Sequence, residues 1–394
     1  MQVYRTEVIT QLADIDANDW HSLRDASGYQ AGNVFLSHSW LSHMQTHGCV
    51  DNKTIRNTGW QPEFIVIKDE HGRLVAACPM YRKFHSYGEY VFDWAWANAY
   101  EQHGLKYYPK LLSAIPFTPV CGQRLLARDT DARKALIAAV LEHAKLTKVS
   151  SVHYLLPHSI EQSALESAQL MPRKGVQFHW LNRDQHGLPF AHMDAFLASL
   201  SQPKRKKIKA ERRKVADSGV VVERIYGDSI SEADWSFFYR CYERTYLEHR
   251  SSPYLNEAFF QAVGQSMPEA FILVKATFQG NAIAASLLMR DTDRLYGRYW
   301  GALAHIPCLH FEACYYQAIE AAIELGLAVV EGGAQGEHKM ARGFVPTVTT
   351  SAHWLAEPAF ADAVQRFLER EGAGMDGYLD ELHERLPFKQ TQSI

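Results

Sequence analysis

Hydrophobic residues occur along this chain in two patterns, short apolar runs bounded by turn residues, which are typical of strands, and spacings of three and four, which are typical of helices. The apolar runs predict two β-hairpins, the first at residues 64–68 and 74–80 and the second at 271–277 and 282–289. Apolar spacings of three and four predict helices at residues 35–47, 132–146, 234–249, 311–325 and 357–386, and two further strands are expected at 151–156 and 328–331. This order of hairpin, long helix and strand indicates an α/β or α+β layered fold.

The two predicted hairpins resemble each other in sequence, and matching residues are separated by a nearly constant distance. The matching stretches are residues 64–68 with 271–275 (offset 207), 74–77 with 282–285 (offset 208) and the tyrosine pairs 107–108 with 315–316 (offset 208). The constant offset favours an internal duplication, although two unrelated α/β halves can share such features by chance. A length of 394 residues also fits two domains. We expect them at residues 1–185 and 186–394, divided at a polar stretch that contains Gly187 and Pro189.

The composition is that of an ordinary globular protein, with 47% hydrophobic and 22% charged residues. This balance excludes an extended disordered chain, a collagen-like fibre and a coiled-coil rod. A net charge of −3 excludes a protein that coats nucleic acid with a uniformly cationic surface. The six cysteines show no CxxC spacing, so we interpret them as reduced thiols of a cytoplasmic protein. No apolar run reaches the length of a transmembrane helix or a signal peptide, so neither is predicted.

One segment is nevertheless strongly basic. Residues 204–214 hold eight lysines and arginines and a single acid, Glu211. Ser201 and Pro203 predict the start of a helix, and Ser218-Gly219 predicts its end. The segment is either a solvated surface helix or a site for a polyanion, such as a tRNA backbone, the phosphates of coenzyme A or an acidic lipid surface. Uncompensated repulsion between like charges favours the polyanion.

The segment from Arg298 to Arg342 carries the densest set of chemically useful side chains. Glu312 shares a helical face with Tyr316, Ile319 and Ile323, and that face is otherwise apolar. A carboxylate on such a face must be paired or must shift its pKa. The alternative is a purely structural acid held by an arginine or by backbone donors. A glycine-rich turn then leads into Glu337, His338 and Lys339, which offer an acid, a base and a cation. A polar turn with a capping role is the other interpretation of that stretch.

Other common catalytic patterns are missing from the sequence. The glycine-rich turn fits neither a P-loop nor a dinucleotide-binding turn. No HExxH and no GxSxG motif occurs. His310 and Glu312 are not accompanied by further potential metal ligands in a recognisable spacing, so we predict no metal site.

Several short motifs, taken in order, carry a resemblance to a known family. They are Tyr108-Pro109-Lys110-Leu111, Pro116-Phe117-Thr118-Pro119, Arg298-Tyr299-Trp300-Gly301, His310-Phe311-Glu312, Tyr315-Tyr316, Gly336-Glu337-His338-Lys339 and Arg342-Gly343-Phe344. This set resembles the FemAB-like predicted N-acyltransferases of bacteria, a peptidoglycan-related family within the superfamily of acyltransferases with the GNAT fold. The resemblance covers residues 20–360 or so. It implies two GNAT-like domains in tandem, with mixed sheets flanked by helices.

The resemblance also implies transfer of an acyl or aminoacyl group to an amine. The donor would be aminoacyl-tRNA or acyl-CoA, with no permanently bound cofactor. The acceptor would be the amine of a peptide, a cell-wall precursor or a small molecule. One departure concerns coenzyme A. GNAT enzymes hold its pyrophosphate with Q/R-x-x-G-x-G/A, and this chain has Leu303 at the last position and extra residues before the helix.

Amide formation needs a neutral amine, donors for the tetrahedral oxyanion and close positioning of both reactants. We expect Glu312 or Glu337 to accept the amine proton, with His338 as the alternative base. Residues expected to bind substrate or donor are Arg298, Trp300, His310, Tyr315, Lys339, Arg342, Lys204 and Arg205. The first domain lacks an equivalent of Glu337-His338-Lys339 and is the expected inert half. The alternatives are a non-catalytic protein that recognises a cell-wall or nucleotide ligand, and an acyl-CoA-dependent enzyme of small metabolites. The oligomeric state is left open.

Overall fold

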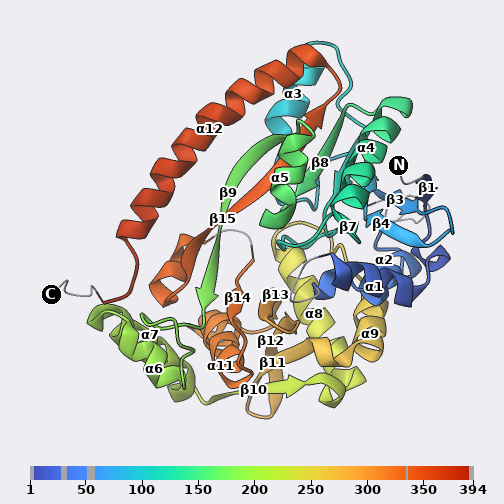
Figure 1. The fold of residues 1–394 in the computed structure, drawn as a ribbon. Helices are drawn as coiled ribbons and strands as arrows, with labels where there is room; N and C mark the ends of the chain where they lie inside the picture. Colours follow the sequence, from blue (N-terminus) through green and yellow to red (C-terminus); the bar gives the residue numbers. More distant parts are fainter. Residues whose placement is uncertain (1–3, 28–32, 51–57, 334–335, 390–394) are drawn as a thin grey trace. The chain divides into compact units, whose positions relative to one another are not determined.

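The computed structural model describes residues 4–27, 33–50, 58–333 and 336–389, and the chain divides into two compact units. Unit 1 comprises Met1–Gly175 and Val348–Tyr378, and unit 2 comprises Val176–Thr347 and Leu379–Ile394. The chain passes from one unit to the other within two long strands, β9 (Met171–Leu181) and β15 (Val345–Leu355), and a third time within helix α12 (Pro358–Glu384) (Figure 1). Because β15 leads back into unit 1, residues 348–378 are counted there, whereas the division at residue 185 assigns them to the second domain. The predicted division at residue 185 separates two domains of related fold rather than two compact units, and it stays a prediction.

Unit 1 holds two sets of hydrogen-bonded strands and most of the N-terminal helices. Its strands are β1 (Arg5–Ile9), β2 (Trp60–Pro62), β3 (Phe64–Lys68), β4 (Leu74–Cys78), β5 (Tyr81–Lys83), β6 (Lys110–Ser113), β7 (Leu126–Ala127) and β8 (Ser151–Leu155). One set is antiparallel in the order β1-β3-β4-β7, and the other follows the order β15-β8-β6-β5-β2 with β6 and β8 parallel. The helices are α1 (Ala17–Ala26), α2 (His38–Thr46), α3 (Trp94–Gln102), α4 (Thr130–Leu146), α5 (Ser159–Ser167) and most of α12 (Pro358–Glu384).

The first predicted hairpin is confirmed as β3 and β4, which pair antiparallel around a turn. Gly72 in that turn has φ of +77°, a conformation that glycine adopts without strain. The helix predicted at residues 35–47 begins later, because Ser37 is extended and caps α2 by accepting a hydrogen bond from the Trp40 backbone N–H. A 3-10 turn, Val34–Leu36, precedes it.

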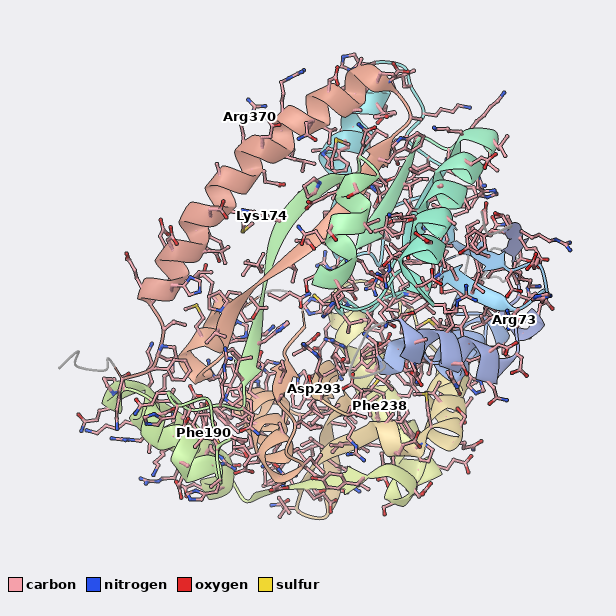
Figure 2. The ribbon with its side chains drawn as sticks, viewed as in Figure 1. Arg73, Lys174, Phe190, Phe238, Asp293 and Arg370 are labelled. Atoms are coloured by element: carbon pink, nitrogen blue, oxygen red, sulfur yellow. The ribbon has the colours of Figure 1, made fainter. Side chains whose placement is uncertain are left out.

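Unit 2 is built on the strand order β10-β11-β12-β13-β14-β9. The strands not yet named are β10 (Val220–Tyr226), β11 (Phe271–Phe278), β12 (Asn281–Arg290), β13 (Arg294–Ala302) and β14 (Val329–Glu331). Its helices are α6 (Met193–Ser199), α7 (Gln202–Asp217), α8 (Glu232–Glu248), α9 (Glu257–Ser266), α10 (Leu309–Phe311), a π segment (Glu312–Tyr316) and α11 (Gln317–Glu324). The second predicted hairpin is confirmed as β11 and β12. The core between α8, α9 and the sheet is aromatic, with Phe238 fully buried among the side chains of this unit (Figure 2).

The repeat is supported by the hairpins but not by the tyrosine pairs. Tyr107 and Tyr108 precede β6 in non-helical backbone, whereas Tyr315 and Tyr316 lie in the π segment. The two pairs therefore occupy different kinds of element, and their match as part of the duplication is wrong. In the part of the chain that the structure describes, the cysteines are not joined in disulfides. Within the described residues, no helix has both the length and the apolar character needed to cross a bilayer.

The feature of unit 2 that positions the candidate site is the separation of two neighbouring strands. β13 and β14 are the parallel pair of this sheet, and they are in register only from Arg294 with Val329 to Tyr296 with Glu331. Beyond Tyr296, β13 continues to Ala302 while β14 has ended. The helix formed by α10, the π segment and α11 connects the two strands, as the sequence predicts. A short connection, residues 303–308, joins the part of β13 that has left β14 to the first residues of this helix.

The free end of β13 packs tightly against α8, which predicts a strong effect of one added methyl group. A Cβ on Gly301 would lie 1.8 Å from the backbone oxygen of Cys241. Because both contacting groups are backbone, Gly301→Ala must push strand and helix apart. We expect a loss of about 3 kcal/mol in the free energy of unfolding, measured by urea denaturation.

The matched control is Gly372→Ala in α12, where nothing lies within 4 Å of the added Cβ. Alanine favours a helix interior by about 0.5–1 kcal/mol over glycine, so this variant should be as stable as the wild type or slightly more so. Equal stability of the two variants would contradict the packing described for β13.

Candidate active site

Glu312 is buried and held by an arginine of the basic segment. Its two carboxylate oxygens accept hydrogen bonds from the Arg212 guanidinium at 3.0 and 3.1 Å, and Gln317 donates to one of them at 2.8 Å. Arg212 also donates to Glu320 at 2.6 Å. The acid that the helical pattern places on an apolar face is thus paired, by a residue one hundred positions earlier in the chain. Its assignment as the catalytic base stays a prediction.

Glu337 has a different environment at the start of the turn after β14. Its side chain is 42% exposed and lies 2.9 Å from the Arg385 guanidinium. This turn is a short 3-10 helix, Glu337–Arg342, that begins at Gly336 with φ of +115°. Residues 334 and 335 of the glycine-rich stretch lie outside the described residues. The acid is therefore at the surface of unit 2, whereas Glu312 is inside it.

His338 and Tyr315 form the hydrogen-bonded pair at the centre of the cluster. The Tyr315 hydroxyl lies 2.9 Å from Nε2 of His338, and the tautomer decides which group donates. Burial, and after it the charges of Lys339 and Arg342, lowers the pKa of His338. Burial also raises the pKa of Tyr315 well above its ordinary value. At neutral pH the pair is an uncharged imidazole beside an uncharged phenol, and the imidazole remains exposed to solvent.

A series of neighbouring aromatic rings connects the His338–Tyr315 pair with a cavity at the start of α10. The His310 ring lies 5.4 Å from both the Trp300 and the Tyr315 ring centroids. Burial, with smaller contributions from His338, Arg342 and Lys339, lowers the pKa of His310 to about 4, so its ring is neutral. The cavity has a volume of about 550 Å³. Its lining residues come from the end of α8, the end of β13, the connection 303–308 and the start of α10, and include Arg244, Thr245, Trp300, Leu303, Cys308 and His310.

The predicted cations of the site are buried and already paired. Arg298 is 2% exposed at its side chain and lies 3.3 Å from Glu331. Arg342 lies 2.8 Å from Glu211, donates to the backbone oxygen of His338 and stacks on the Phe311 ring at 3.5 Å. These contacts bring Arg342 to the cluster and join Arg298 to β14, and the role of both arginines in binding phosphate or carboxylate stays a prediction.

Lys339 is buried beside the same loop. Its Nζ donates to the backbone oxygens of Gly332 at 2.7 Å and Gly333 at 3.3 Å. Burial, and next the Arg298 charge, lowers the pKa of Lys339 to about 8. The ammonium thus ties the loop after β14 to the 3-10 turn that carries His338.

The lowered pKa of Lys339 predicts a pH-dependent difference in stability. A lysine whose pKa is lower in the folded state destabilises that state below the folded pKa, and the cost disappears as the pH rises from about 8 towards the ordinary value of 10.5. Across this pH interval, we expect the free energy of unfolding of the wild type to rise by up to about 3 kcal/mol relative to that of Lys339→Met. Parallel stability curves for the two proteins, from thermal melts at successive pH values, would refute the shift.

Lys204 and Arg205 lie in the first turns of α7 and are partly exposed. Ser201 occupies the N-cap position, as the sequence predicts, although its side chain makes no capping hydrogen bond, and Gln202 and Pro203 begin the helix. The residues of α7 that turn inward are Ile208, Glu211 and Val215. The contacts of the described residues do not join Lys204 or Arg205 to the cluster, and their role stays a prediction.

Sequence reasoning missed two residues of the site. Glu211 accepts hydrogen bonds from both Arg342 and the Tyr316 hydroxyl. Its spacing from Ile208 and Val215, three and four residues, places it on the inner face of α7 and was the signal available. Cys308, before α10, has φ of +70° in the left-handed region, which is unusual for a residue other than glycine. No sequence pattern predicts that backbone conformation.

Among the described residues, no group of three or more histidine, cysteine, aspartate or glutamate side chains is arranged to hold a metal ion. The chemistry of the cluster is that of a neutral base, a neutral phenol and hydrogen-bond donors beside an aromatic cavity. This set can remove a proton from an amine without a metal.

A family model described as peptidoglycan biosynthesis/recognition, FemAB-like, matches residues 11–390 of the chain. Among solved structures, L-PGS from Bacillus licheniformis is similar with a TM-score of 0.52 and 11% identity, over 90% of this chain and 97% of that one. The crystal structure of FemX is similar with a TM-score of 0.51 and 11% identity, over 91% of this chain and 100% of that one. The comparison with curated proteins gave no match. These similarities confirm the expected fold class as a mixed α/β fold, which this chain shares with FemX and L-PGS.

Proposed function

The chain belongs to the FemAB-like family, and from this we propose that it is an N-acyltransferase that moves an acyl or aminoacyl group from an activated donor to an amine. The family and its fold support an acyl- or aminoacyltransferase. The observation that carries the proposal for this chain is the neutral His338–Tyr315 pair beside the cavity at Trp300 and His310.

The proposed reaction joins the amine nitrogen to the carbonyl carbon of the donor. The nitrogen lone pair forms the new bond, the carbonyl oxygen takes negative charge, and the bond to the leaving oxygen or sulfur then breaks. One proton leaves the nitrogen and one is needed by the leaving group. His338 accepts the first, directly or through the Tyr315 hydroxyl, and the raised pKa of Tyr315 keeps that hydroxyl able to pass a proton on.

His338 fits the role of base better than either acid. Both carboxylate oxygens of Glu312 accept hydrogen bonds from the Arg212 guanidinium, and Gln317 donates to one of them, so this acid is held inside unit 2 rather than presented to an amine. Glu337 lies against the Arg385 guanidinium at 2.9 Å, whereas His338 is hydrogen-bonded to Tyr315 beside the aromatic cavity. We therefore assign to Glu312 the positioning of α7 against the helix that carries Tyr315.

The cavity at the start of α10 is the proposed donor site. It is lined by Trp300 and His310, whose uncharged rings suit the apolar part of an acyl or aminoacyl group. The start of the helix after Cys308 is suited to a negative charge of the donor, because helix N-termini favour anions. Aminoacyl-tRNA and acyl-CoA both carry an activated carbonyl and phosphate groups in one molecule, so the proposal includes both as donors.

Incubation of the purified protein with separate donors and amines tests the proposal. Acyl-CoA and aminoacyl-tRNA panels are mixed with peptide and small-molecule amines, and products are identified by mass spectrometry. We expect a new amide, with a mass gain equal to the acyl group, from one donor class. Tight binding of a ligand with no amide from any pair would instead support the non-catalytic recognition protein.

A further inference from the structure

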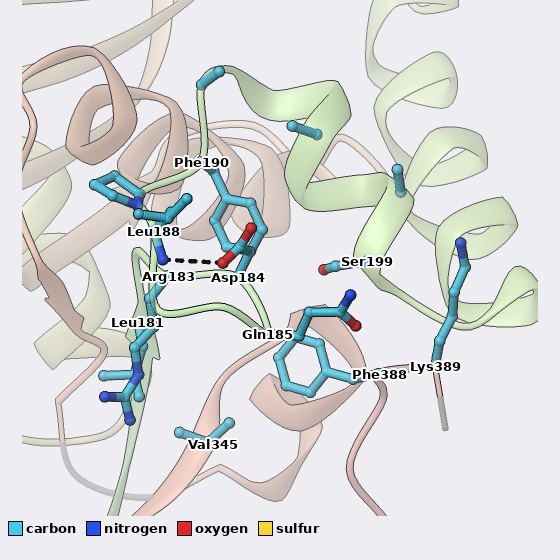
Figure 3. Close-up of a pocket in the computed structure, with 14 residues that line it drawn as sticks. Leu181, Arg183, Asp184, Gln185, Leu188, Phe190, Ser199, Val345, Phe388 and Lys389 are labelled. Atoms are coloured by element: carbon cyan, nitrogen blue, oxygen red, sulfur yellow. Dashed lines mark hydrogen bonds between the residues drawn. The ribbon is translucent and has the colours of Figure 1, made fainter. Parts of the chain in front are cut away.

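A second cavity in unit 2 lies away from the candidate active site, beside α6. Its volume is about 750 Å³. Its walls are largely apolar, with Phe190 on one side and Phe388 and Val345 on the other, and Arg183 and Lys389 belong to its lining (Figure 3). None of these residues lines the cavity at Trp300, so the proposed transfer reaction does not account for it.

The loop at the mouth of this cavity presents an apolar side chain to solvent. Leu188 is 63% exposed. The loop is nevertheless ordered, because the backbone N–H groups of His186 and Leu188 donate to the Asp184 carboxylate at 2.8 and 3.0 Å, and the Asp184 N–H donates to the Leu188 oxygen. A fixed turn thus holds a leucine outward, and burying it in an apolar environment would be favourable.

The basic face of α7 adjoins the same cavity. The backbone N–H of Ser201, at the junction of α6 and α7, donates to the Pro387 oxygen at 2.9 Å, and Leu200 bridges to Phe388, a wall of the cavity. Lys209 lies 3.7 Å from Asp194 of α6. The exposed cations of α7 are Lys206, Lys207, Lys209, Arg213 and Lys214. Glu211, the acid of this stretch, is turned inward to Arg342 and leaves the outer face basic.

We propose that this face of unit 2 docks on an anionic phospholipid membrane. The lysines of α7 contact the headgroups, Leu188 enters the interface, and the cavity between Phe190 and Phe388 receives an acyl chain. Basic clusters beside exposed apolar side chains bind anionic bilayers by this combination of attraction and burial. RNA offers the same phosphates but has no acyl chain for the cavity, and the exposed face of α7 carries no aromatic side chain on which a base could stack.

Vesicle co-sedimentation of the full chain tests this surface. Vesicles of phosphatidylcholine alone are compared with an equimolar mixture of phosphatidylcholine and phosphatidylglycerol. We expect binding to the mixed vesicles only, weakened by salt because the headgroup attraction is screened. Lys206→Glu with Lys207→Glu should reduce this binding at least about tenfold, because two attractive charges become repulsive. Leu188→Asp should reduce it as well.

The control variant carries Lys134→Glu with Lys145→Glu, the same charge change on exposed positions of α4 in unit 1. It should bind the mixed vesicles like the wild type, and melting curves should show all variants folded. Equal binding to neutral vesicles, unchanged binding of the α7 variant, or binding to tRNA without binding to vesicles would each overturn the proposal. Vesicle binding is measured without donor or amine, so its failure is distinct from a failure of the transfer reaction.

Discussion

Replacing His338 by glutamine should lower kcat for amide formation by about 10²–10⁴-fold, the range typical of a lost general base. Glutamine keeps the size and polarity of the side chain but cannot take up the proton. Because His338 is exposed and bonded to Tyr315, the variant should melt close to the wild type. Steady-state kinetics at saturating donor and amine measure the loss, and the wild-type rate should fall at low pH as His338 becomes protonated.

The matched control is His383→Gln, the same substitution at an exposed residue of α12 that does not line the cavity. It should retain kcat. Glu312→Gln and Glu337→Gln separate the rival bases. If either acid variant loses turnover to the degree expected for His338→Gln while His338→Gln stays active, the proton acceptor is that acid.

The largest expected loss of stability comes from Glu211. Its carboxylate lies inside unit 2, where it accepts from Arg342 at 2.8 Å and from the Tyr316 hydroxyl. Glu211→Leu leaves the Arg342 guanidinium, which is 4% exposed, without its acid. Breaking a buried ion pair by removing one partner costs about 3–5 kcal/mol, so the midpoint of urea unfolding should fall sharply. Activity should fall with it, because Arg342 also holds the His338 backbone.

The double variant Glu211→Leu with Arg342→Met distinguishes the ion pair from simple packing. Removing both charges removes the uncompensated guanidinium, and we expect the double variant to be more stable than Glu211→Leu alone. Additive losses in the two single variants and the double variant would mean that the pair contributes little. Glu232→Leu, an exposed acid at the start of α8, serves as the surface control.

The elements that the sequence predicted are those whose periodicity is local. The hairpins β3–β4 and β11–β12 are short apolar runs around a glycine turn, and the basic helix is bounded by Ser201 and Ser218. The π segment was not predicted, because Glu312–Tyr316 has the same spacing pattern as an ordinary helix. The tyrosine match failed for a related reason, since two identical dipeptides carry no information about their backbone.

The partners of the charged residues could not be predicted, because they are far apart in the chain. Arg212 forms an ion pair with Glu312, 100 positions later in the chain, and Glu211 forms one with Arg342, 131 positions later. Unit 1 contains a second such network, in which Lys110 donates to Glu89 and Asp93, and His153 meets His353 across 200 positions. The sequence indicated that Glu312 needed a partner but not which residue supplies it. Only the fold brings these groups together.

A structure of the protein with a hydrolysis-resistant donor analogue tests the central claim most directly. The account predicts that the analogue occupies the cavity at Trp300 and His310, with its carbonyl carbon reached from the side of Tyr315 and His338. An analogue bound elsewhere, with that pair facing empty solvent, would contradict the assignment of this cluster as the place where the amide bond forms.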